Sequence, residues 1–472
     1  MRSSSASSRR SSASPSRRGA CSAEPAPLNA EPERDRLPVV ARPLLEAARR
    51  FGTPLYATDV AALDEAAEAA RRAFPEPWLR QYSLKANDVA AIVRLIAERG
   101  LGANVVSRGE WAVARRAGIA NGQITFEGVG KTDDDLRAAV GSARGGAPVR
   151  WLAIESVDEA VALARIAGTA RRAPATRPRA AAPLDVLFRL NPDVTPETHP
   201  GLAVGAGSSK FGMTEAELSE AIDALRATTA VRPRGIHLHV GSQLGAIDAW
   251  RDAVRRTLAL LALLRGSMPD FDTLDVGGGF PVARIGERVP SPERFGREVP
   301  ALLDAIPEDR RPRRLAIEPG RFLVARSGWI VARVLHVRAR GGPLVVIDAG
   351  MTELIRPALY GARHDIVALT SLAREVDHRH GAGATVARAG AAAGAVPATS
   401  VHGPICESTD ELGPHDLPPL RRGDVVAIRD TGAYGASQSS TYNGRPRPPQ
   451  ILIQPNGDVI LARRRGSVTT LG

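Results

Sequence analysis

The sequence predicts two folded units: a barrel of alternating strands and helices, followed by a domain made mainly of strands. Three observations lead to this prediction. The chain has 472 residues, which is enough for two or three domains of ordinary size. Short apolar runs alternate eight times with Ala-, Leu- and Arg-rich stretches of helical periodicity. After residue 322 that periodicity fades, and Val- and Ile-rich runs separated by turn residues replace it.

Eight short apolar segments fit the strands of the first unit, and with the stretches between them they span about 240 residues. They are short, apolar and β-prone, as strands of a parallel sheet are. In chain order these segments are 81–87, 101–107, 123–128, 151–156, 184–192, 235–242, 273–280 and 314–321.

The stretches between the strands show helical spacing, for example 88–100, 108–118 and 248–266. Eight strand–helix units in this length are typical of a (β/α)8 barrel. An open, doubly wound sheet would show the same alternation. We favour the barrel, over residues 61–322, because the count stops at eight and the pattern then changes.

The second unit is predicted as a β-sandwich or β-barrel domain formed by residues 37–60 and 323–472. The segment 51–59, which precedes the first barrel helix, is expected to supply one of its strands. Residues 381–399 are rich in Ala and Gly, so we expect them to form a flexible loop. The remaining strand candidates are 329–339, 343–350, 424–432, 450–455 and 458–464.

The net charge of +12 comes mainly from two short segments. Residues 1–20 carry five Arg and residues 168–183 carry four, and neither segment contains an acid. The rest of the chain is therefore close to neutral, which argues against nucleic-acid binding by the folded body. Residues 1–36 are rich in Ser, Arg and Pro and are predicted to be a disordered tail.

The sequence also favours a cytoplasmic protein that does not bind membranes. No run of 18 or more apolar residues could span a bilayer. The basic N-terminus lacks the apolar stretch of a secretory signal. Two cysteines cannot form a disulfide framework, so a reducing compartment fits best.

Only three lysines occur beside 60 arginines. Arginine cannot replace lysine where an amine must lose its proton and attack a carbonyl, so each lysine is a candidate for chemistry. Lys85 ends the first predicted strand, and barrel enzymes carry their active residues at this end of the strands. Lys131 follows the third strand and is expected on the surface, while Lys210 is expected to order a loop.

Residues with suitable chemistry also follow three later strands. His239 and Ser242 follow the sixth, the triplet 277–279 of glycines follows the seventh, and Glu318 and Arg321 follow the eighth. Glycines let backbone N–H groups approach an anion, and Ser and Arg side chains can complete a phosphate site. Together with the lysine, this combination suggests pyridoxal phosphate held as a Schiff base, and it includes no metal site.

Longer segments resemble the fold-type III pyridoxal-phosphate-dependent decarboxylases, and within them the diaminopimelate decarboxylase family. The resemblance implies an alanine-racemase-like barrel with a C-terminal β domain. It also implies decarboxylation of meso-2,6-diaminopimelate to L-lysine and CO2, the last step of lysine biosynthesis. The matching segments are YSLKAND (82–88), NPDVTPETHPG (191–201), SSKFGM (208–213), HLHVGSQL (237–244), DVGGGFP (275–281), EPGRFLVA (318–325), DAGMTELIRPALYGARH (348–364), GPICESTD (403–410) and TGAYGASQSSTYNGRPRP (431–448).

The resemblance implies a role for each matching residue around the cofactor. Lys85 would bind pyridoxal phosphate covalently, His239 would stack on its ring, and Glu318 would pair with the pyridine nitrogen. That pairing would keep the ring a strong electron sink, which favours decarboxylation over racemisation. The phosphate region would be held by Ser242, Gly277, Gly278, Gly279, Gly320, Arg321 and Tyr434.

The same resemblance implies a substrate site that is completed in a homodimer. Cys406 would donate a proton to the carbon that CO2 leaves, acting from the partner subunit. Arginines can clamp a carboxylate, and an acid can meet the distal ammonium. The substrate contacts would be Arg321, Arg356, Tyr360, Glu407 and Tyr434.

Three positions depart from the family pattern. Asn104 stands where relatives commonly carry Asp, Thr409 where Gly is usual, and Gln450 where Glu is usual.

Two other functions stay open. One alternative is a decarboxylase for ornithine, arginine or carboxynorspermidine, which the second carboxylate contact of Arg356 argues against. The other is a non-catalytic pyridoxal-phosphate-binding regulator, which the presence of Lys85, Glu318 and Cys406 argues against.

Overall fold

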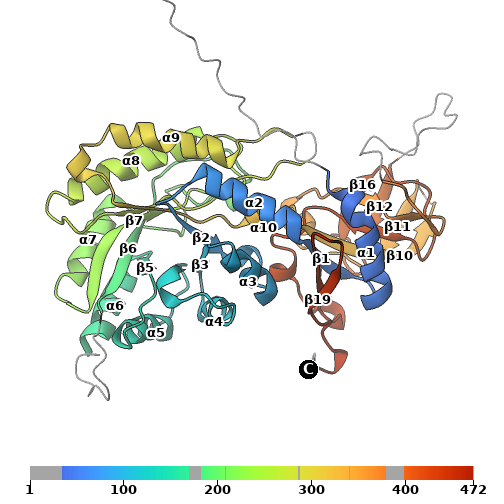
Figure 1. Cartoon of the computed structure of the whole chain (residues 1–472), viewed down its shortest axis with the longest axis horizontal. Helices are drawn as coiled ribbons and strands as arrows, with labels where there is room; N and C mark the ends of the chain where they lie inside the picture. The colour runs from blue at the N-terminus through green and yellow to red at the C-terminus, as the bar shows by residue number, and fades with distance from the viewer. Residues whose placement is uncertain are drawn as a thin grey trace, which may run out of the picture.

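Eight parallel strands close into a barrel in the N-terminal part of the chain (Figure 1). The last strand pairs with the first through Leu79–Ala316 and Arg80–Ile317, so the sheet has no free edge. Every strand predicted for the barrel is confirmed, and the barrel is confirmed over the open sheet. The strands are β2 (Leu79–Ser83), β3 (Gly102–Val105), β4 (Ile124–Phe126), β5 (Trp151–Ile154), β6 (Leu184–Leu190), β7 (Val231–Leu238), β8 (Thr273–Asp275) and β9 (Arg314–Ile317).

This computed structural model describes residues 35–169, 182–207, 209–284, 287–339, 341–378 and 398–470. Residues 1–34, most of the Arg-rich segment 168–183 and nearly all of the expected loop 381–399 lie outside the described residues. The predictions of a disordered tail and of a flexible loop therefore stay predictions.

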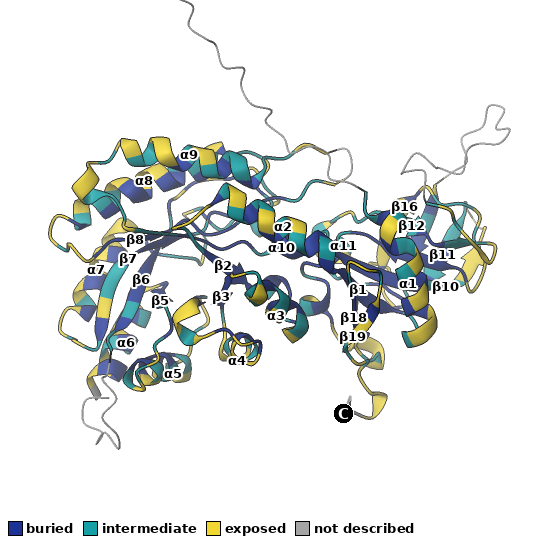
Figure 2. Cartoon of the chain, viewed as in Figure 1, coloured by how far each residue is buried: buried dark blue, intermediate teal, exposed yellow. Residues whose placement is uncertain are grey.

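Helices surround the barrel and turn their apolar faces toward it. Figure 2 shows this arrangement on α8 and α9, whose inner residues are buried and outer residues exposed. Several helices begin at a side-chain cap, and Thr132 and Thr214 each form a reciprocal capping box. The helices are α2 (Val60–Ala73), α3 (Ala90–Glu98), α4 (Arg108–Arg116), α5 (Asp133–Arg144), α6 (Val157–Thr169), α7 (Glu215–Leu225), α8 (Asp248–Leu264), α9 (Pro292–Asp304) and the short α10 (Arg321–Val324).

The second domain contains a nine-stranded sheet that includes one strand from before the barrel. Strand β1 (Leu55–Asp59) pairs antiparallel with β10 (Gly328–Arg338) and parallel with β18 (Gln450–Ile453). The prediction that 51–59 contributes a strand to this domain is therefore confirmed. The other strands are β11 (Leu344–Ile347), β12 (Ile366–Ala368), β15 (Thr399–His402), β16 (Glu411–His415), β17 (Val425–Ile428) and β19 (Val459–Arg463).

Shorter elements complete the second domain. A two-stranded ribbon forms from β13 (Thr370–Ser371) and β14 (Arg374–Glu375), and α11 (Arg356–Tyr360) lies before β12. Helix α1 (Leu37–Phe51) packs beside the sheet, where Val40 and Leu44 join the buried cluster around Trp329 (Figure 1). None of the described helices is long and apolar enough to cross a membrane.

Two ion pairs attach the start of helix α1 to the β domain and the barrel entrance. Asp35 accepts hydrogen bonds of 2.6 and 3.1 Å from Arg429. Arg36 donates to both carboxylate oxygens of Asp59, at 2.7 and 3.1 Å. Burial would raise the pKa of Asp35, but the Arg429 hydrogen bond and charge keep it below its ordinary value. Residues 35 and 36 belong to the predicted tail, but these ion pairs hold them in place.

A pair of truncations should separate the tail from these ion pairs. Deleting residues 1–34 should leave the free energy of unfolding unchanged, whereas deleting 1–36 should lower it by about 1–3 kcal/mol, because charged hydrogen bonds are lost. The Asp35 contribution should be present above its ordinary pKa of 3.8 and disappear as the pH falls through its lowered value. Urea unfolding at several pH values measures both effects. Equal stability of the two truncations would contradict this role.

Candidate active site

The carboxyl ends of strands β2, β7, β8 and β9 bring together the residues that the sequence singled out. Lys85 lies in the short 3-10 helix η1 (Leu84–Ala86), directly after β2. His239 follows β7 directly, Gly277 is the second residue after β8, and Glu318 follows β9 directly. Because parallel strands of a barrel share one end, these residues meet although they are far apart in the sequence.

The turn that carries Lys85 is held by a loop of the β domain. The Tyr434 N–H donates to Ala86 O at 2.8 Å, and the Asn87 amide donates to Gly432 O at 2.9 Å. The Ser437 hydroxyl lies within 3.1 Å of Lys85 O. Both domains therefore fix the position of this lysine, and the loss of these hydrogen bonds would displace it.

The glycine triplet lies where no larger residue fits. A Cβ on Gly277 would lie 2.3 Å from Leu238 O, and one on Gly278 would lie 2.3 Å from Glu318 O. Gly279 has a φ of +104° and would meet Gly241 O at 2.5 Å. The backbone of the turn after β8 thus lies very close to the backbone of the neighbouring segments, as in a phosphate-binding turn.

His239 faces this triplet as a neutral ring. Its Nδ1 accepts the Gly278 N–H at 3.1 Å, so that nitrogen carries no proton. Burial, with the positive charge of Lys85 nearby, holds the pKa of His239 well below its ordinary value. The ring can therefore stack on a flat ligand without adding a positive charge.

Two buried guanidinium groups form one side of the site. Arg321 donates to the Ser242 hydroxyl at 3.1 and 3.3 Å and lies 4.7 Å from the centre of the Tyr434 ring. Arg356 lies 5.7 Å from that ring and 5.6 Å from the ring of Tyr360. Burial and the charge of Arg321 lower the pKa of Arg356 to about 10. Neither arginine has a carboxylate partner within the described parts of the chain, so this side is suited to anionic groups.

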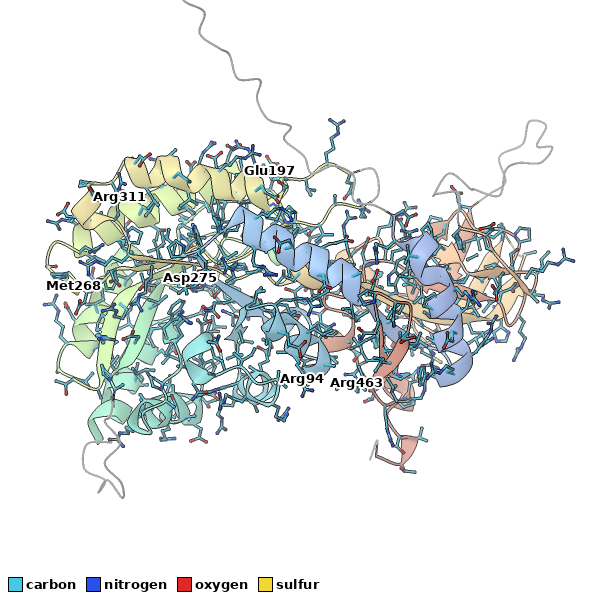
Figure 3. All side chains as sticks on the ribbon, in the orientation of Figure 1. Arg94, Glu197, Met268, Asp275, Arg311 and Arg463 are labelled. Carbon is cyan, nitrogen blue, oxygen red and sulfur yellow. The ribbon has the colours of Figure 1, made fainter. Side chains whose placement is uncertain are left out.

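A second set of buried groups is a cluster of carboxyl groups around Glu318. The Asn104 amide donates to Glu318, and His237 Nε2 lies 3.4 Å from Glu318 and 3.5 Å from Glu127. Asp275, the last residue of β8, lies inside the barrel and is fully buried (Figure 3). Burial and the charge of Glu318 raise the pKa of Glu127 to about 8 and that of Asp275 well above its ordinary value.

Sequence reasoning missed Glu127, His237 and Asp275 as members of the site. Glu127 directly follows β4, and Asp275 ends β8, so both occupy the strand ends that carry function in barrels. His237 stands two residues before His239, and the two-residue period of a strand puts both on one face. These positional signals could have found all three residues.

Cys406 and Glu407 lie apart from these residues in the described chain. The Cys406 thiol is free and exposed. Glu407 is also exposed and accepts a 2.6 Å hydrogen bond from the Tyr442 hydroxyl. Within the described residues, no hydrogen bond or ion pair is found between either side chain and the turn of Lys85.

The other two lysines have structural surroundings. The expectation that Lys131 lies on the surface is wrong, because its side chain is fully buried and pairs with Glu159 at 3.0 Å. Lys210 is exposed, with its ammonium 5.4 Å from the centre of the Phe211 ring. Neither lysine stands at a strand end beside the glycine triplet, so Lys85 stays the candidate for covalent chemistry.

The three departures from the family pattern have different surroundings. Asn104 contacts Glu318 inside the carboxyl cluster. Gln450 is buried and donates to the Thr58 hydroxyl at 3.0 Å, which links β18 to β1. Thr409 is exposed, and nothing in the structure explains it.

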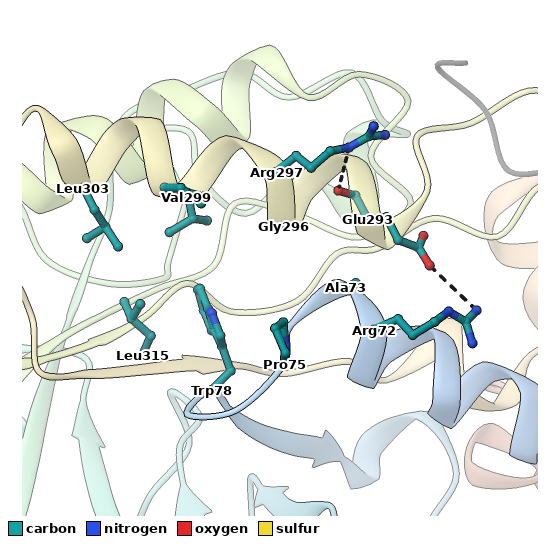
Figure 4. Close-up of a pocket in the computed structure, with 11 residues that line it drawn as sticks. Arg72, Ala73, Pro75, Trp78, Glu293, Gly296, Arg297, Val299, Leu303 and Leu315 are labelled. Carbon is teal, nitrogen blue, oxygen red and sulfur yellow. Dashed lines mark hydrogen bonds and ion pairs between the residues drawn. The ribbon is translucent and has the colours of Figure 1, made fainter. Parts of the chain in front are cut away.

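A groove of about 560 Å³ lies at the other end of the barrel (Figure 4). It runs between α2 and α9, where Arg72 and Glu293 lie 3.9 Å apart. Trp78, just before β2, and Leu315, early in β9, line its floor. Because these residues belong to the amino ends of their strands, the groove is separate from the site described above.

Comparisons with known proteins agree with this geometry. The family model described as pyridoxal-dependent decarboxylase, pyridoxal binding domain, matches residues 60–325. The diaminopimelate decarboxylase of Aquifex aeolicus is 33% identical over 425 residues, which cover 89% of this chain and 91% of that protein. The diaminopimelate decarboxylase of Deinococcus radiodurans is 34% identical over 89% of this chain and 95% of its own.

A solved structure shares both domains. The diaminopimelate decarboxylase of Helicobacter pylori, in complex with L-lysine, superimposes with a TM-score of 0.77 at 28% sequence identity. The match covers 90% of this chain and 98% of that one. The barrel and the strand-rich domain therefore both have counterparts in this relative.

Replacing Gly278 with Ala should damage the phosphate side of the site. The new methyl would lie 2.3 Å from Glu318 O, so the ends of β8 and β9 must separate. We expect affinity for pyridoxal phosphate, measured by titrating the apoprotein, to fall about tenfold or more. Gly122→Ala is the matched control, because nothing lies within 4 Å of the added methyl. Equal affinities of the two variants would contradict the close approach.

Proposed function

The chain belongs to the pyridoxal-dependent decarboxylase family, and from this we propose that it is a diaminopimelate decarboxylase. It removes CO2 from meso-2,6-diaminopimelate with pyridoxal phosphate and releases L-lysine, the last step of lysine biosynthesis. The observation that carries this conclusion is the sequence identity, which holds at about a third of the aligned positions across both domains. The aligned region includes the second domain, to which Arg356 and Tyr434 belong.

The buried groups at the strand ends fit pyridoxal phosphate. The glycine triplet leaves a cradle that a Cβ would fill, and Arg321 offers a buried cation beside it. The carboxylate of Glu318 is buried at the end of β9, where we expect it to meet a protonated pyridine nitrogen. The donor atoms of Glu127, His237 and Glu318 lie within 4.8 Å of one another, a spacing that would also suit a divalent cation. Pyridoxal phosphate, the cofactor of the family, already accounts for the position of Glu318, so no divalent cation is needed to explain it.

When bound, pyridoxal phosphate supplies an electron sink for the bond that breaks when CO2 departs. We assign Lys85 to its covalent attachment and His239 to stacking on its ring. Glu318 keeps the pyridine nitrogen protonated. Ser242, Arg321, Tyr434, Gly320 and the triplet Gly277, Gly278 and Gly279 hold the phosphate.

We assign the substrate contacts to the arginine side of the site. The second buried guanidinium, Arg356, suits the distal carboxylate of a substrate with two carboxyl groups. Ornithine and arginine lack that group, so this arginine argues against those substrates. Tyr360 lies beside Arg356, and Glu407 of the partner subunit would meet the distal ammonium.

We further propose that the enzyme is a homodimer in which the partner's Cys406 protonates the carbon that loses CO2. Support comes from the exposed positions of Cys406 and Glu407, which form no hydrogen bond or ion pair with the lysine turn in the described part of their own chain. An exposed free thiol also suits a reducing compartment, so we propose the cytoplasm as its location. We expect no binding to nucleic acid or membranes.

Purified protein should release L-lysine and CO2 from meso-diaminopimelate, and Lys85→Ala should abolish this activity because the amine is essential for attachment. Borohydride should fix the cofactor on Lys85, as read by mass spectrometry of the digested protein. Lys210→Ala, which changes an exposed lysine, is the control and should keep both activity and labelling. A reduced adduct on Lys131 or Lys210 would overturn the assignment. Lysine absent from the products of the unmodified holoenzyme would overturn the function.

Mixing two inactive variants should test the shared site. Lys85→Ala and Cys406→Ala subunits, once exchanged, would form mixed dimers with one damaged and one intact site. About a quarter of the wild-type rate should return, since half the dimers are mixed and each has one intact site. Native mass spectrometry confirms the exchange. If exchange is complete and no activity returns, both residues serve one site from the same chain.

A further inference from the structure

Glu127 is a buried acid that the proposed mechanism does not use. It directly follows β4 and is 4% exposed. Its backbone N–H donates to Val105 O at 2.9 Å, which continues the pairing of β4 with β3. Its Oε1 has no hydrogen-bond partner in the described structure. The strand pairing thus aims this carboxyl group into the barrel, beside the residues proposed to meet the cofactor.

The neighbours of Glu127 contain more acids than cations. Its side chain interacts with Glu318 and Asn104 and lies 3.5 Å from Nε2 of His237. The charge of Glu127 also contributes to the raised pKa of Asp275. Arg189, whose charge reaches His237, is already paired with Glu155 at 2.8 Å. Lys85 is the remaining cation whose charge reaches His237. Three buried carboxyl groups therefore share a space that cannot hold three negative charges.

Protons on both Glu127 and Asp275 relieve this repulsion. Burial, together with the charge of Glu318, raises the pKa of both groups, and that of Glu127 reaches about 8. Burial lowers the pKa of His237 to about 4, so this ring is neutral and does not balance the acids. At neutral pH, Glu127 is consequently a carboxylic acid with a proton to donate.

We propose that Glu127 is a positioning residue: as a neutral acid it donates a hydrogen bond to Glu318, and together with the Asn104 amide it orients that carboxylate toward the pyridine nitrogen. The inference rests on the proposed function, because it takes Glu318 as the partner of that nitrogen. Asn104 and Glu127 then act as one pair, since each presents a neutral donor to Glu318.

Three variants test the pair. Glu127→Gln replaces a neutral donor with another, so affinity of the apoprotein for pyridoxal phosphate should stay within about threefold. Asn104→Asp removes a donor and adds a fourth carboxyl group, so affinity should fall about tenfold or more. In the double variant the acid and the amide exchange places, and affinity should return toward that of the unmodified protein.

Glu155→Gln is the matched control. Glu155 directly follows β5 as Glu127 follows β4, and both are buried. Burial opposes ionisation of Glu155, but the charge of Arg189 lowers its pKa, so this residue is an ionised partner. Its amide variant should therefore lower the melting temperature of the apoprotein, whereas Glu127→Gln should not.

Two measurements report the proton without requiring activity. The infrared carbonyl stretch of a protonated carboxylic acid should be present in the apoprotein at pH 7 and weaken in Glu127→Gln. The folded protein keeps a proton that the unfolded chain releases, so the free energy of unfolding should fall as pH rises from the ordinary 4.5 to about 8. That decline should flatten in Glu127→Gln and persist in Glu155→Gln.

The outcomes separate this inference from the proposed function. An unchanged infrared band in Glu127→Gln, or a loss of cofactor affinity as large as in Asn104→Asp, would overturn the role of Glu127. A double variant no better than Asn104→Asp would overturn the pairing. If the unmodified protein binds pyridoxal phosphate but makes no lysine, the proposed function fails, and these binding and infrared results still decide the role of Glu127.

Discussion

The site depends on the contact between the turn after β2 and the loop around Tyr434. Tyr434 has a φ of +60°, a left-handed conformation that is strained for an aromatic residue. Its N–H bond to Ala86 O compensates part of that strain and places the ring beside Arg321. Gly432 in the same loop would clash with Val324 O if it carried a Cβ. The two domains can therefore approach closely enough to share one site.

The order of the elements along the chain also connects the two domains. Strand β1 belongs to the sheet of the second domain, and α2 then leads into the barrel. After β9, the short helix α10 returns the chain to β10, which pairs with β1. The barrel is thus inserted between adjacent strands of one sheet, so both of its ends are attached to that sheet.

Charge is divided between two sides of the site. Among the described residues, Arg321 and Arg356 are buried without acidic partners on one side, and three carboxyl groups are buried around Glu318 on the other. A ligand with anionic groups at one end and a protonated ring nitrogen at the other would neutralise both sides. Burial makes each of these interactions stronger than it would be in water, which explains why so many charged residues can be tolerated in the interior.

The sequence by itself determined the barrel, the strand that joins the second domain, and the set Lys85, His239, Ser242 and Glu318. These follow from local periodicity and from the rule that functional residues stand at the carboxyl ends of barrel strands. Only the tertiary structure decided the burial of Lys131, the ion pair between Asp35 and Arg429, and the cluster that joins Glu127 and Asp275 to Glu318. Burial and the number of charges that share a space depend on residues distant in the chain, and no local pattern contains that information.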